Sequence, residues 1–438
     1  MSGCFRQMGP ALRGRGEVGR RIMDLISGCP FWIIKNGILG VYPTLRENVE
    51  CEVAIIGGGV SGALIGYRLA EAGIDAVMLD KRDIGTGSTA ASTSLLQYET
   101  DLTLTELSGR MGEENAVRVY RACRAAVKSI GALARRVKGG DFTGRDSLYL
   151  ANTRREVAGL KREFELRRKH GFDVSWWTRK RIAGESSLPH HAAIESHDAA
   201  EIDAFEFTHA VVRAAAEMRK GLRVFDRTAV TSWKRVDARG AVGKGRSAGG
   251  GGGGFVLTTA DGFRVKARRL VVAAGYESLN FFRKKPAKCH STYALVTEPL
   301  ETRAGWPGER LIWETARPYI YARTTADGRA IIGGYDEEFR DPQRRDALLV
   351  AKTGALQRRF GQLFPEIRCD VAFSWTGTFA ETKDSLPYIG EAPGRPGIYF
   401  ALGYGGNGVI FSALAAEIIR AAIVGERNAL AELFRFGR

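Results

Sequence analysis

The sequence has few cysteines and no long apolar run, so it offers little for disulfide cross-links, membrane anchoring or secretion. It contains six cysteines in 438 residues, and no two stand in a Cys-x-x-Cys pair, which argues against a zinc site or a disulfide framework. No apolar run reaches the roughly 18–20 residues that span a bilayer. The N-terminus also lacks the uninterrupted apolar stretch of a secretory signal. We therefore expect free thiols, no metal, no membrane span and a cytoplasmic location.

Acidic residues are outnumbered. Lys and Arg total 65 against 49 Asp and Glu, a net charge of +16, which can attract anionic substrates, nucleic acid or a membrane surface. Basic runs such as 179–181 and 283–285 have no interleaved aromatic residues, which a nucleic-acid platform requires. We interpret the charge as a solvated surface and expect no nucleic-acid partner.

Two segments show no periodic pattern. Residues 1–22 are rich in Arg and Gly, with Met23 as an alternative start, and residues 237–254 close on six consecutive glycines. Such compositions do not support a packed core. We predict disorder in both, the second as a long loop between two strands.

The most informative stretch runs from Cys51 to Asp80. An apolar run leads into Gly-Gly-Gly-Val-Ser-Gly, followed by a helical segment and a second apolar run that ends on Asp80. This order is typical of a dinucleotide-binding βαβ unit. Gly57 permits the tight turn, Gly59 lets the backbone approach a pyrophosphate, and Gly62 lets the helix pack closely on the strand. Asp80 stands where a carboxylate can accept hydrogen bonds from ribose hydroxyls.

Later segments extend this pattern. A buried strand ends in Leu270–Gly275 (LVVAAG), and a glycine-rich loop at 403–408 precedes an apolar helix at 409–423. Alternation predicts antiparallel strands, with Asp327-Gly328 as a hairpin turn. The predicted strands are 291–300, 311–323, 329–335, 371–375 and 398–402, with a loop at 376–397 and helices at 103–137, 154–170 and 204–220.

Together, GGGVSG with Asp80, LVVAAG, TKDSLPYIG at 382–390 and GYGGNG at 403–408 resemble the D-amino-acid oxidase superfamily over roughly residues 50–425. Glycine oxidase, sarcosine oxidase and γ-glutamylputrescine oxidase are members. The resemblance implies an α/β fold, with a Rossmann-like FAD-binding domain of the glutathione-reductase type and a second α+β substrate domain built on an antiparallel sheet. The implied parts are an N-terminal extension (1–49), a discontinuous FAD-binding domain (50–140, 196–280 and 370–438) and a substrate domain (141–195 and 281–369).

The same resemblance implies FAD as the cofactor and the residues that hold it. The first glycine motif would hold the pyrophosphate, and Asp80 would hold the adenosine ribose. The 88–92 loop would lie near the flavin side of the phosphates. The 403–408 loop would lie near the pyrimidine edge of the flavin. The implied set is Gly57, Gly59, Val60, Ser61, Gly62, Asp80, Lys81, Ser88, Thr89, Ser92, Val230, Ala274, Gly275, Gly403, Gly405, Gly406, Asn407 and Gly408.

The substrate side departs from the glycine-oxidase pattern. Phe379 stands where such members carry an arginine that clamps the substrate carboxylate, which favours amine-type substrates. Arg317 or Arg323 remains an alternative clamp. Strand alternation places Tyr319, Tyr321 and Arg323 on one face as a substrate wall.

Three further positions are candidates on the resemblance. Tyr404 is a candidate flavin cover, Lys288 a candidate promoter of the reaction with oxygen, and Cys289 a possible covalent attachment point for the flavin.

The predicted reaction removes a hydride from the carbon beside an amine or amino-acid nitrogen, delivers it to flavin N5 and leaves an imine that hydrolyses. O2 or another acceptor would reoxidise the flavin. Two alternatives stay open: an FAD-dependent dehydrogenase that acts on a non-amine anionic substrate and reduces a quinone, and a tRNA-modifying flavoprotein.

Overall fold

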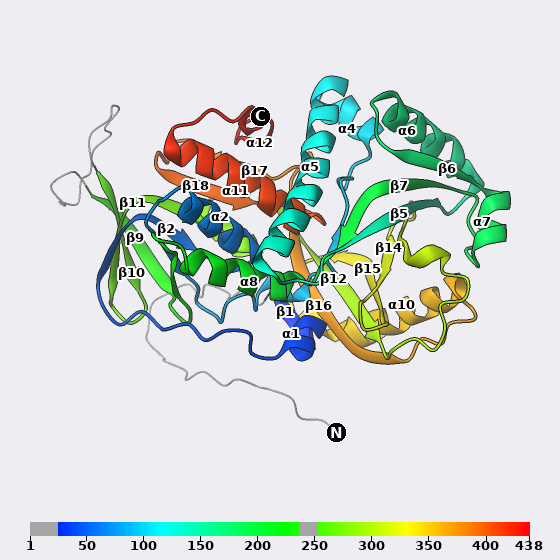
Figure 1. Cartoon of the computed structure of the whole chain (residues 1–438), viewed down its shortest axis with the longest axis horizontal. Helices are drawn as coiled ribbons and strands as arrows, with labels where there is room; N and C mark the ends of the chain where they lie inside the picture. The colour runs from blue at the N-terminus through cyan, green and yellow to red at the C-terminus, as the bar shows by residue number, and fades with distance from the viewer. Residues whose placement is uncertain (1–24, 237–252) are drawn as a thin grey trace.

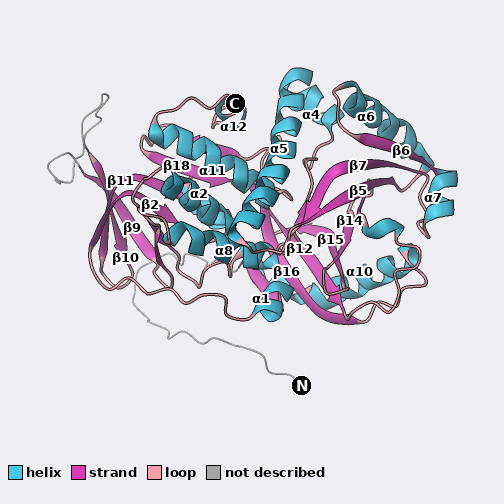
Figure 2. Cartoon of the chain, in the orientation of Figure 1, coloured by secondary structure: helices cyan, strands magenta, loops and turns pink. Residues whose placement is uncertain are grey.

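Two β-sheets lie side by side in the computed structural model, which describes residues 25–236 and 253–438 (Figure 1). A helical cluster covers one sheet, and separate helices cover the other (Figure 2). The predicted fold class is confirmed, because a parallel sheet and a largely antiparallel sheet are both present.

The eight-stranded sheet has a parallel centre of five strands. Its central strands are buried on both faces, as parallel strands usually are, and every residue of Ala76–Leu79 is buried. Its strands, in spatial order, are β17 (Tyr388–Glu391), β18 (Ile398–Leu402), β11 (Arg264–Val272), β2 (Val49–Ile56), β3 (Ala76–Leu79) and β8 (Arg223–Phe225), with β10 (Gly254–Thr259) paired to β11 and β9 (Val230–Val236) to β10.

Helices cover one face of this sheet and a hairpin covers the other. Buried side chains of α2 (Val60–Glu71), α5 (Glu113–Val137), α8 (Ala204–Ala216) and α11 (Gly408–Val424) pack together over the first face. On the second face, Ala54, Val77 and Leu79 pack with Phe255 and Leu257 of β10. The sheet therefore has a core on each side.

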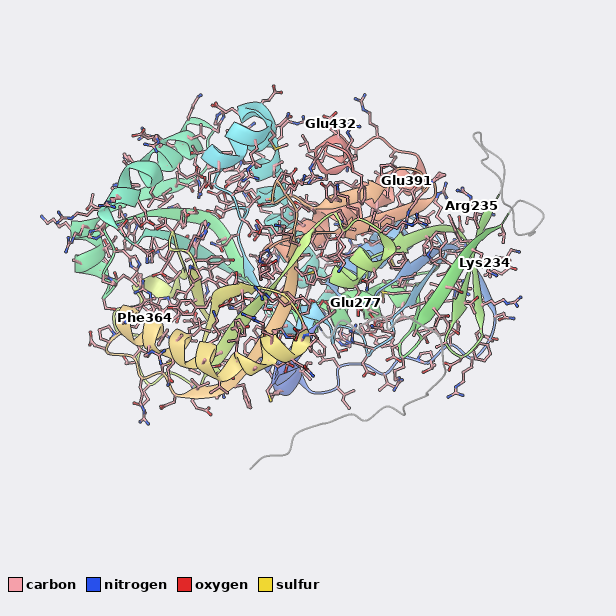
Figure 3. The ribbon with its side chains drawn as sticks, turned by 180° about the vertical axis from the view of Figure 1, so that it is seen from behind. Lys234, Arg235, Glu277, Phe364, Glu391 and Glu432 are labelled. Carbon is pink, nitrogen blue, oxygen red and sulfur yellow. The ribbon has the colours of Figure 1, made fainter. Side chains whose placement is uncertain are left out.

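The ten-stranded sheet is antiparallel except for one parallel pair, β13 with β5. Its strands, in order, are β1 (Ile26–Gly28), β16 (Val371–Glu381), β12 (Lys288–Thr297), β15 (Ala330–Glu338), β14 (Ile320–Thr324), β13 (Leu311–Glu314), β5 (Thr143–Ala151), β7 (Ala192–Glu201) and β4 (Leu95–Leu96), with β6 (Val174–Thr178) paired to β7. The helix α10 (Leu349–Leu363) packs on β12, β15 and β16. Phe364, labelled in Figure 3, follows the end of α10. Its ring stacks on that of Trp306, with centroids 4.5 Å apart.

Shorter helices complete the fold. They are α1 (Phe31–Asn36), α3 (Ser88–Ala91), α4 (Leu104–Met111), α6 (Val157–Lys169), α7 (Arg179–Glu185), α9 (Pro342–Ala347) and α12 (Ala431–Phe434), with 3-10 helices at Arg154–Glu156, Gly275–Phe281 and Pro307–Glu309. None of the described helices is both long and apolar enough to cross a membrane.

The described part of the N-terminal extension packs on the rest of the chain. Strand β1 pairs with β16, and Trp32 of α1 is 1% exposed and donates to the Ser92 carbonyl at 2.6 Å. Asn36 donates to Asp203, the N-cap of α8, at 2.7 Å. Residues 25–36 therefore brace the 88–92 loop. The predictions for 1–22 and most of 237–254 fall outside the described residues.

Several element boundaries differ from the sequence-based expectation. The helix expected over 103–137 is two helices, because Gly112 has φ +84° and ends α4. The strand expected over 311–323 is the pair β13 and β14. The loop expected at 376–397 contains the end of β16 and all of β17, and the helix expected over 204–220 ends at Ala216.

Two segments assigned to the FAD-binding part pair in the other sheet. Residues 196–201 belong to β7, and residues 371–381 form β16, and both strands pair within the ten-stranded sheet. Residues that the resemblance assigned to the FAD-binding domain therefore form strands in both sheets.

A buried arginine network joins α6 to the loop before α4. Arg167, fully buried, donates to Glu163 at 2.6 Å and to Glu99 at 2.7 Å. Glu163 also accepts from the first backbone N–H groups of α4, at Leu104 (2.9 Å) and Thr105 (2.8 Å). One guanidinium thus balances two buried carboxylates.

The variant Arg167→Leu should lower the free energy of unfolding by about 3–5 kcal/mol, because it leaves two buried carboxylates without their cation. Guanidinium denaturation of the FAD-loaded protein measures the change. Arg162→Leu, the same substitution at an exposed position on the same helix, is the control and should change stability by no more than about 0.5 kcal/mol. Equal midpoints for the two variants would contradict this role of Arg167.

Candidate active site

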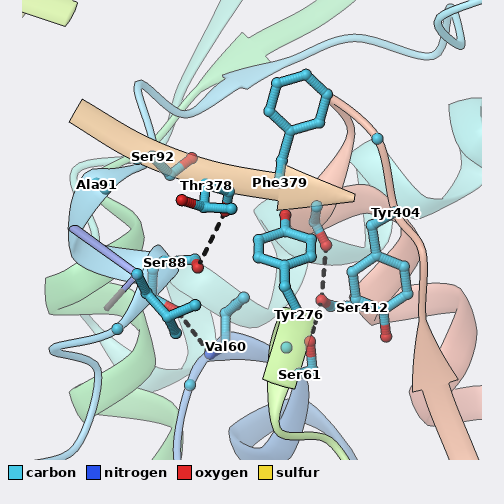
Figure 4. A pocket seen from close by; sticks show the side chains of 18 of the residues that line it. Val60, Ser61, Ser88, Ala91, Ser92, Tyr276, Thr378, Phe379, Tyr404 and Ser412 are labelled. Atoms are coloured by element: carbon cyan, nitrogen blue, oxygen red, sulfur yellow. Dashed lines mark hydrogen bonds between the residues drawn. The ribbon is translucent and has the colours of Figure 1, made fainter. Parts of the chain in front are cut away.

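One cavity of about 930 Å³ runs between the two sheets. Its lining begins at the carboxyl ends of β2 and β3, passes the starts of α2 and α11, and ends against β14 and β15 of the ten-stranded sheet. A crevice at the carboxyl edge of a parallel sheet is where α/β folds bind ligands. Figure 4 shows side chains of β16, from the ten-stranded sheet, facing side chains from helix starts and loops beside the eight-stranded sheet.

The first glycine motif forms one end. Gly57 has φ +113°, and a Cβ there would lie 2.4 Å from the Ala273 carbonyl oxygen. A Cβ on Gly62 would lie 1.9 Å from the Gly57 carbonyl oxygen, so Gly62 serves helix packing and does not line the cavity. Gly59 does line it, and a Cβ there would meet only the Thr89 hydroxyl, at 3.0 Å. The chain therefore leaves room beside Gly59 on the cavity side.

Asp80 closes the same end. Its carboxylate accepts from the backbone N–H of Gly58 at 2.6 Å and of Arg82 at 2.8 Å, and it faces the cavity. Lys81 lies beside it and pairs with Glu277 at 2.6 Å. Val230, Ala274 and Gly275 line the cavity nearby.

Hydroxyl groups join the starts of three helices. The Thr89 hydroxyl of α3 accepts from the Val60 N–H at 3.0 Å, and the hydroxyls of Ser61 in α2 and Ser412 in α11 lie 2.7 Å apart (Figure 4). Ser88 and Ser92 line the cavity with Thr89. The first turns of α2, α3 and α11 are thereby held around one space.

The start of α11 forms the middle of the cavity. Five residues of its glycine-rich loop line the wall: Tyr404, Gly405, Gly406, Asn407 and Gly408. The Gly406 N–H donates to Asp101 at 3.0 Å, and the Asn407 side chain donates to the Glu99 carbonyl. Gly403 lies behind the wall, where φ +78° turns the chain from β18 into the loop. The helix N-terminus can stabilise negative charge near these residues.

The far end of the cavity is aromatic and acidic. Tyr319 and Tyr321 face it with ring centroids 5.9 Å apart, and Trp313 also lines the cavity. Tyr404 lines the cavity beside Ser61 and Ser412 (Figure 4). Asp101 and Asp336 face the far end, and no sequence pattern had singled them out. Burial raises the pKa of Asp101 to about 7 and that of Asp336 to about 6. Neither residue belongs to a recognisable motif: Asp101 precedes a helix and Asp336 lies in a strand, which are common positions for Asp in any sequence.

Two predicted substrate-side residues lie outside the cavity lining. Arg323 is 3% exposed and donates to the backbone carbonyls of Ser94 and Ile202, each at 3.0 Å. It shares a strand face with the two tyrosines but lies further along β14, where it braces the chain after the 88–92 loop. Lys288 is the exposed first residue of β12, and neither it nor Cys289 reaches the cavity.

Phe379 lines the cavity and stacks on His290 at 5.3 Å. No arginine projects from this position of β16. Arg317, exposed at the rim, is the one arginine among the lining residues next to the tyrosines, and its guanidinium lies 5.1 Å from the Tyr319 ring centroid.

Comparison with known proteins agrees with this geometry. Glycine oxidase of Geobacillus kaustophilus is 25% identical over 385 residues, which cover 84% of this chain and 91% of that protein. Gamma-glutamylputrescine oxidoreductase of Escherichia coli is 26% identical over 403 residues, covering 88% and 86%. The crystal structure of L-proline dehydrogenase from P. horikoshii superposes with a TM-score of 0.71 at 21% identity, covering 89% of this chain and 97% of that one.

Residues 52–422 match the DAO family, described as FAD dependent oxidoreductase. The match spans both sheets and the cavity between them. The chain therefore belongs to the DAO family of FAD-dependent oxidoreductases.

Proposed function

We propose that this FAD-dependent enzyme oxidises a C–N bond of an amine or amino-acid derivative. The observation that carries the proposal is the single cavity, which joins the glycine motif of the eight-stranded sheet to an aromatic and acidic compartment on the ten-stranded sheet. The similar glycine oxidase and gamma-glutamylputrescine oxidoreductase bear names of nitrogen-containing compounds, which supports the same substrate class.

The residues present fit FAD. The space beside Gly59 admits a pyrophosphate, and the N–H groups at the start of α2 have no partner within the helix and face that space. The Asp80 carboxylate would hold the adenosine ribose, with Val230, Ala274 and Gly275 alongside. The loop at 405–408 would meet the flavin ring, where the start of α11 favours the negative charge of its reduced form.

When bound, FAD supplies the acceptor for the hydride that leaves the carbon beside nitrogen. The chain's own contribution is placement and exclusion of water. Tyr319, Tyr321 and Trp313 would give the compartment aromatic walls, and Tyr404 would cover the ring system. The imine product hydrolyses in water after release.

The electron acceptor and the location in the cell belong to the proposal as well. We propose reoxidation by O2 or another acceptor, and a cytoplasmic enzyme, for which the free state of Cys29, Cys51, Cys123, Cys289 and Cys369 is supporting evidence. Oxygen uptake with formation of peroxide distinguishes an oxidase from a dehydrogenase. Lys288 plays no part in this proposal, because it lies at the surface.

The variant Gly59→Ala should weaken FAD binding by at least about tenfold while the apoprotein keeps its thermal midpoint. A Cβ there meets little of the protein, at a φ of −79° that any residue adopts, but it occupies the space proposed for the pyrophosphate. Flavin retained through gel filtration measures the effect. Gly109→Ala, on the open face of α4, is the control and should retain FAD fully. Equal retention in both variants would contradict the assigned position of the pyrophosphate.

Anaerobic addition of an amine substrate should bleach the flavin band near roughly 450 nm, because the two electrons stay on the cofactor when O2 is absent. The measurement is a visible spectrum of the holoenzyme titrated with a panel of amines, amino acids and glycerol phosphate. Bleaching by an amine or amino acid supports C–N oxidation. Bleaching by glycerol phosphate alone, or by no member of the panel, would refute it.

A further inference from the structure

Two carboxyl groups from distant parts of the chain line the far end of the cavity and interact electrostatically. Asp101 comes from the turn before α4, and Asp336 from the end of β15. A Cβ on Gly406 would lie 2.8 Å from Asp101 Oδ1 and 3.9 Å from the Tyr319 hydroxyl, so the carboxyl and the hydroxyl are neighbours. Asp336 acts electrostatically on the same tyrosine. Both carboxyls therefore surround one aromatic side chain at the proposed substrate position.

Negative groups outnumber positive ones in this compartment. Its charged and titratable lining residues are Glu99, Asp101, Asp336, Glu337 and Glu381 against Arg317 and His290. The guanidinium of Arg317 lies at the exposed rim over Tyr319. Glu99 pairs with Arg167 and Glu337 with Lys352, whereas Asp101 and Asp336 form no ion pair with the described residues. These two carboxyls therefore offer hydrogen-bond acceptors without a matching cation.

Glu99 independently indicates that a ligand donates hydrogen bonds in this compartment. It is 3% exposed, and its Oε1 atom accepts from Arg167 at 2.7 Å and from Ser196 at 2.6 Å. Its Oε2 atom has no hydrogen-bond partner among the described residues, although Glu99 lines the cavity. Asp336 Oδ1 is also without one in that part of the chain. Buried acceptors are normally paired, so these two atoms indicate a ligand that brings N–H groups.

The electrostatics of the two carboxyls agree with this indication. Burial is the main cause that raises the pKa of each, and the negative charges of Glu381 and Asp336 raise that of Asp101 further. The Gly406 N–H and Arg317 lower the pKa of Asp101, while Thr292, His290, Tyr319 and Lys352 lower that of Asp336. Asp101 also acts electrostatically on Tyr276. A bound cation would stabilise both ionised carboxylates.

We propose that Asp101 and Asp336 bind the cationic nitrogen of the substrate and that one of the two carboxylates accepts its N–H proton before the hydride leaves, so that the site selects cationic amines over anionic amino-acid-like compounds. The inference rests on the proposed function and specifies its substrate class. An ammonium group carries three N–H donors and no acceptor, which suits a compartment of carboxylate oxygens, and charge-assisted hydrogen bonds of this kind are strong. Phe379 supplies no competing charge from β16.

The direct test measures binding of a cation that is chemically inert. Calorimetric titration of the FAD-loaded protein at pH 8 compares n-butylguanidinium with butyrate. We expect the cation to bind at least about tenfold more tightly than the anion. Asp101→Asn and Asp336→Asn should each weaken cation binding about tenfold, since each keeps the side-chain shape and removes the charge. Glu338→Gln, on the same strand but exposed and outside the cavity, is the matched control and should change binding less than twofold.

The pH dependence gives a second readout in the unmodified enzyme. The guanidinium keeps its charge throughout, so any change in affinity between pH 8 and pH 5 reports on the protein. Carboxylates with pKa values of about 7 and about 6 are ionised at pH 8 and protonated at pH 5. Affinity should therefore fall about tenfold as the pH drops, and this fall should shrink in both asparagine variants.

Two results would overturn the inference: butyrate binding more tightly than the cation, or a cation affinity that neither the pH nor the asparagine variants change. These readouts need no turnover. If no amine bleaches the flavin while the cation still binds through Asp101 and Asp336, the proposed reaction fails and the cation site stands. If amines bleach the flavin while the cation binds no better than butyrate, the reaction stands and the carboxylate site fails.

Discussion

The site depends on two helices that must begin at the same place. The starts of α2 and α11 meet over the carboxyl edge of the eight-stranded sheet, and the 2.7 Å contact between Ser61 and Ser412 fixes their first turns together. Gly62 makes the contact between α2 and the turn at Gly57 possible, because a Cβ there would lie 1.9 Å from a backbone oxygen. The starts of both helices therefore line one cavity, where each favours negative charge.

Residues close together in sequence made the cofactor end predictable. The turn, the helix start and Asp80 all lie within one βαβ unit, whose geometry follows from local glycine positions. Local patterns were insufficient at two places. The apolar period continues across Gly112, so the end of α4 was not predicted. The residues of β7 lack a clear alternation of apolar and polar side chains, so this strand was not predicted. Arg323 shows another limit: alternation gives the face of a strand but not how far along it a side chain lies.

The substrate end was not predictable, because its residues meet only through tertiary packing. Asp101 is placed by the Arg167 network, which holds Glu99 two residues earlier, and by the Gly406 N–H. Asp336 is placed by the pairing of β15 with β14 and β12. No spacing in the sequence relates residue 101 to residue 336. Only closure of the ten-stranded sheet against the start of α11 brings the two carboxyls together.

The net charge of the chain is positive, whereas the charged groups of the proposed substrate compartment are mostly negative. The two are compatible. The chain carries a net charge of +16, which would repel a cationic amine if it acted over long distances. At physiological salt the Debye length is about 8 Å, so charges on the outer surface are largely screened from the cavity. Inside the cavity the dielectric constant is lower and the carboxylates act at contact distance. The proposed selectivity for cations would therefore depend on the carboxylates of Asp101 and Asp336 rather than on the net charge of the chain.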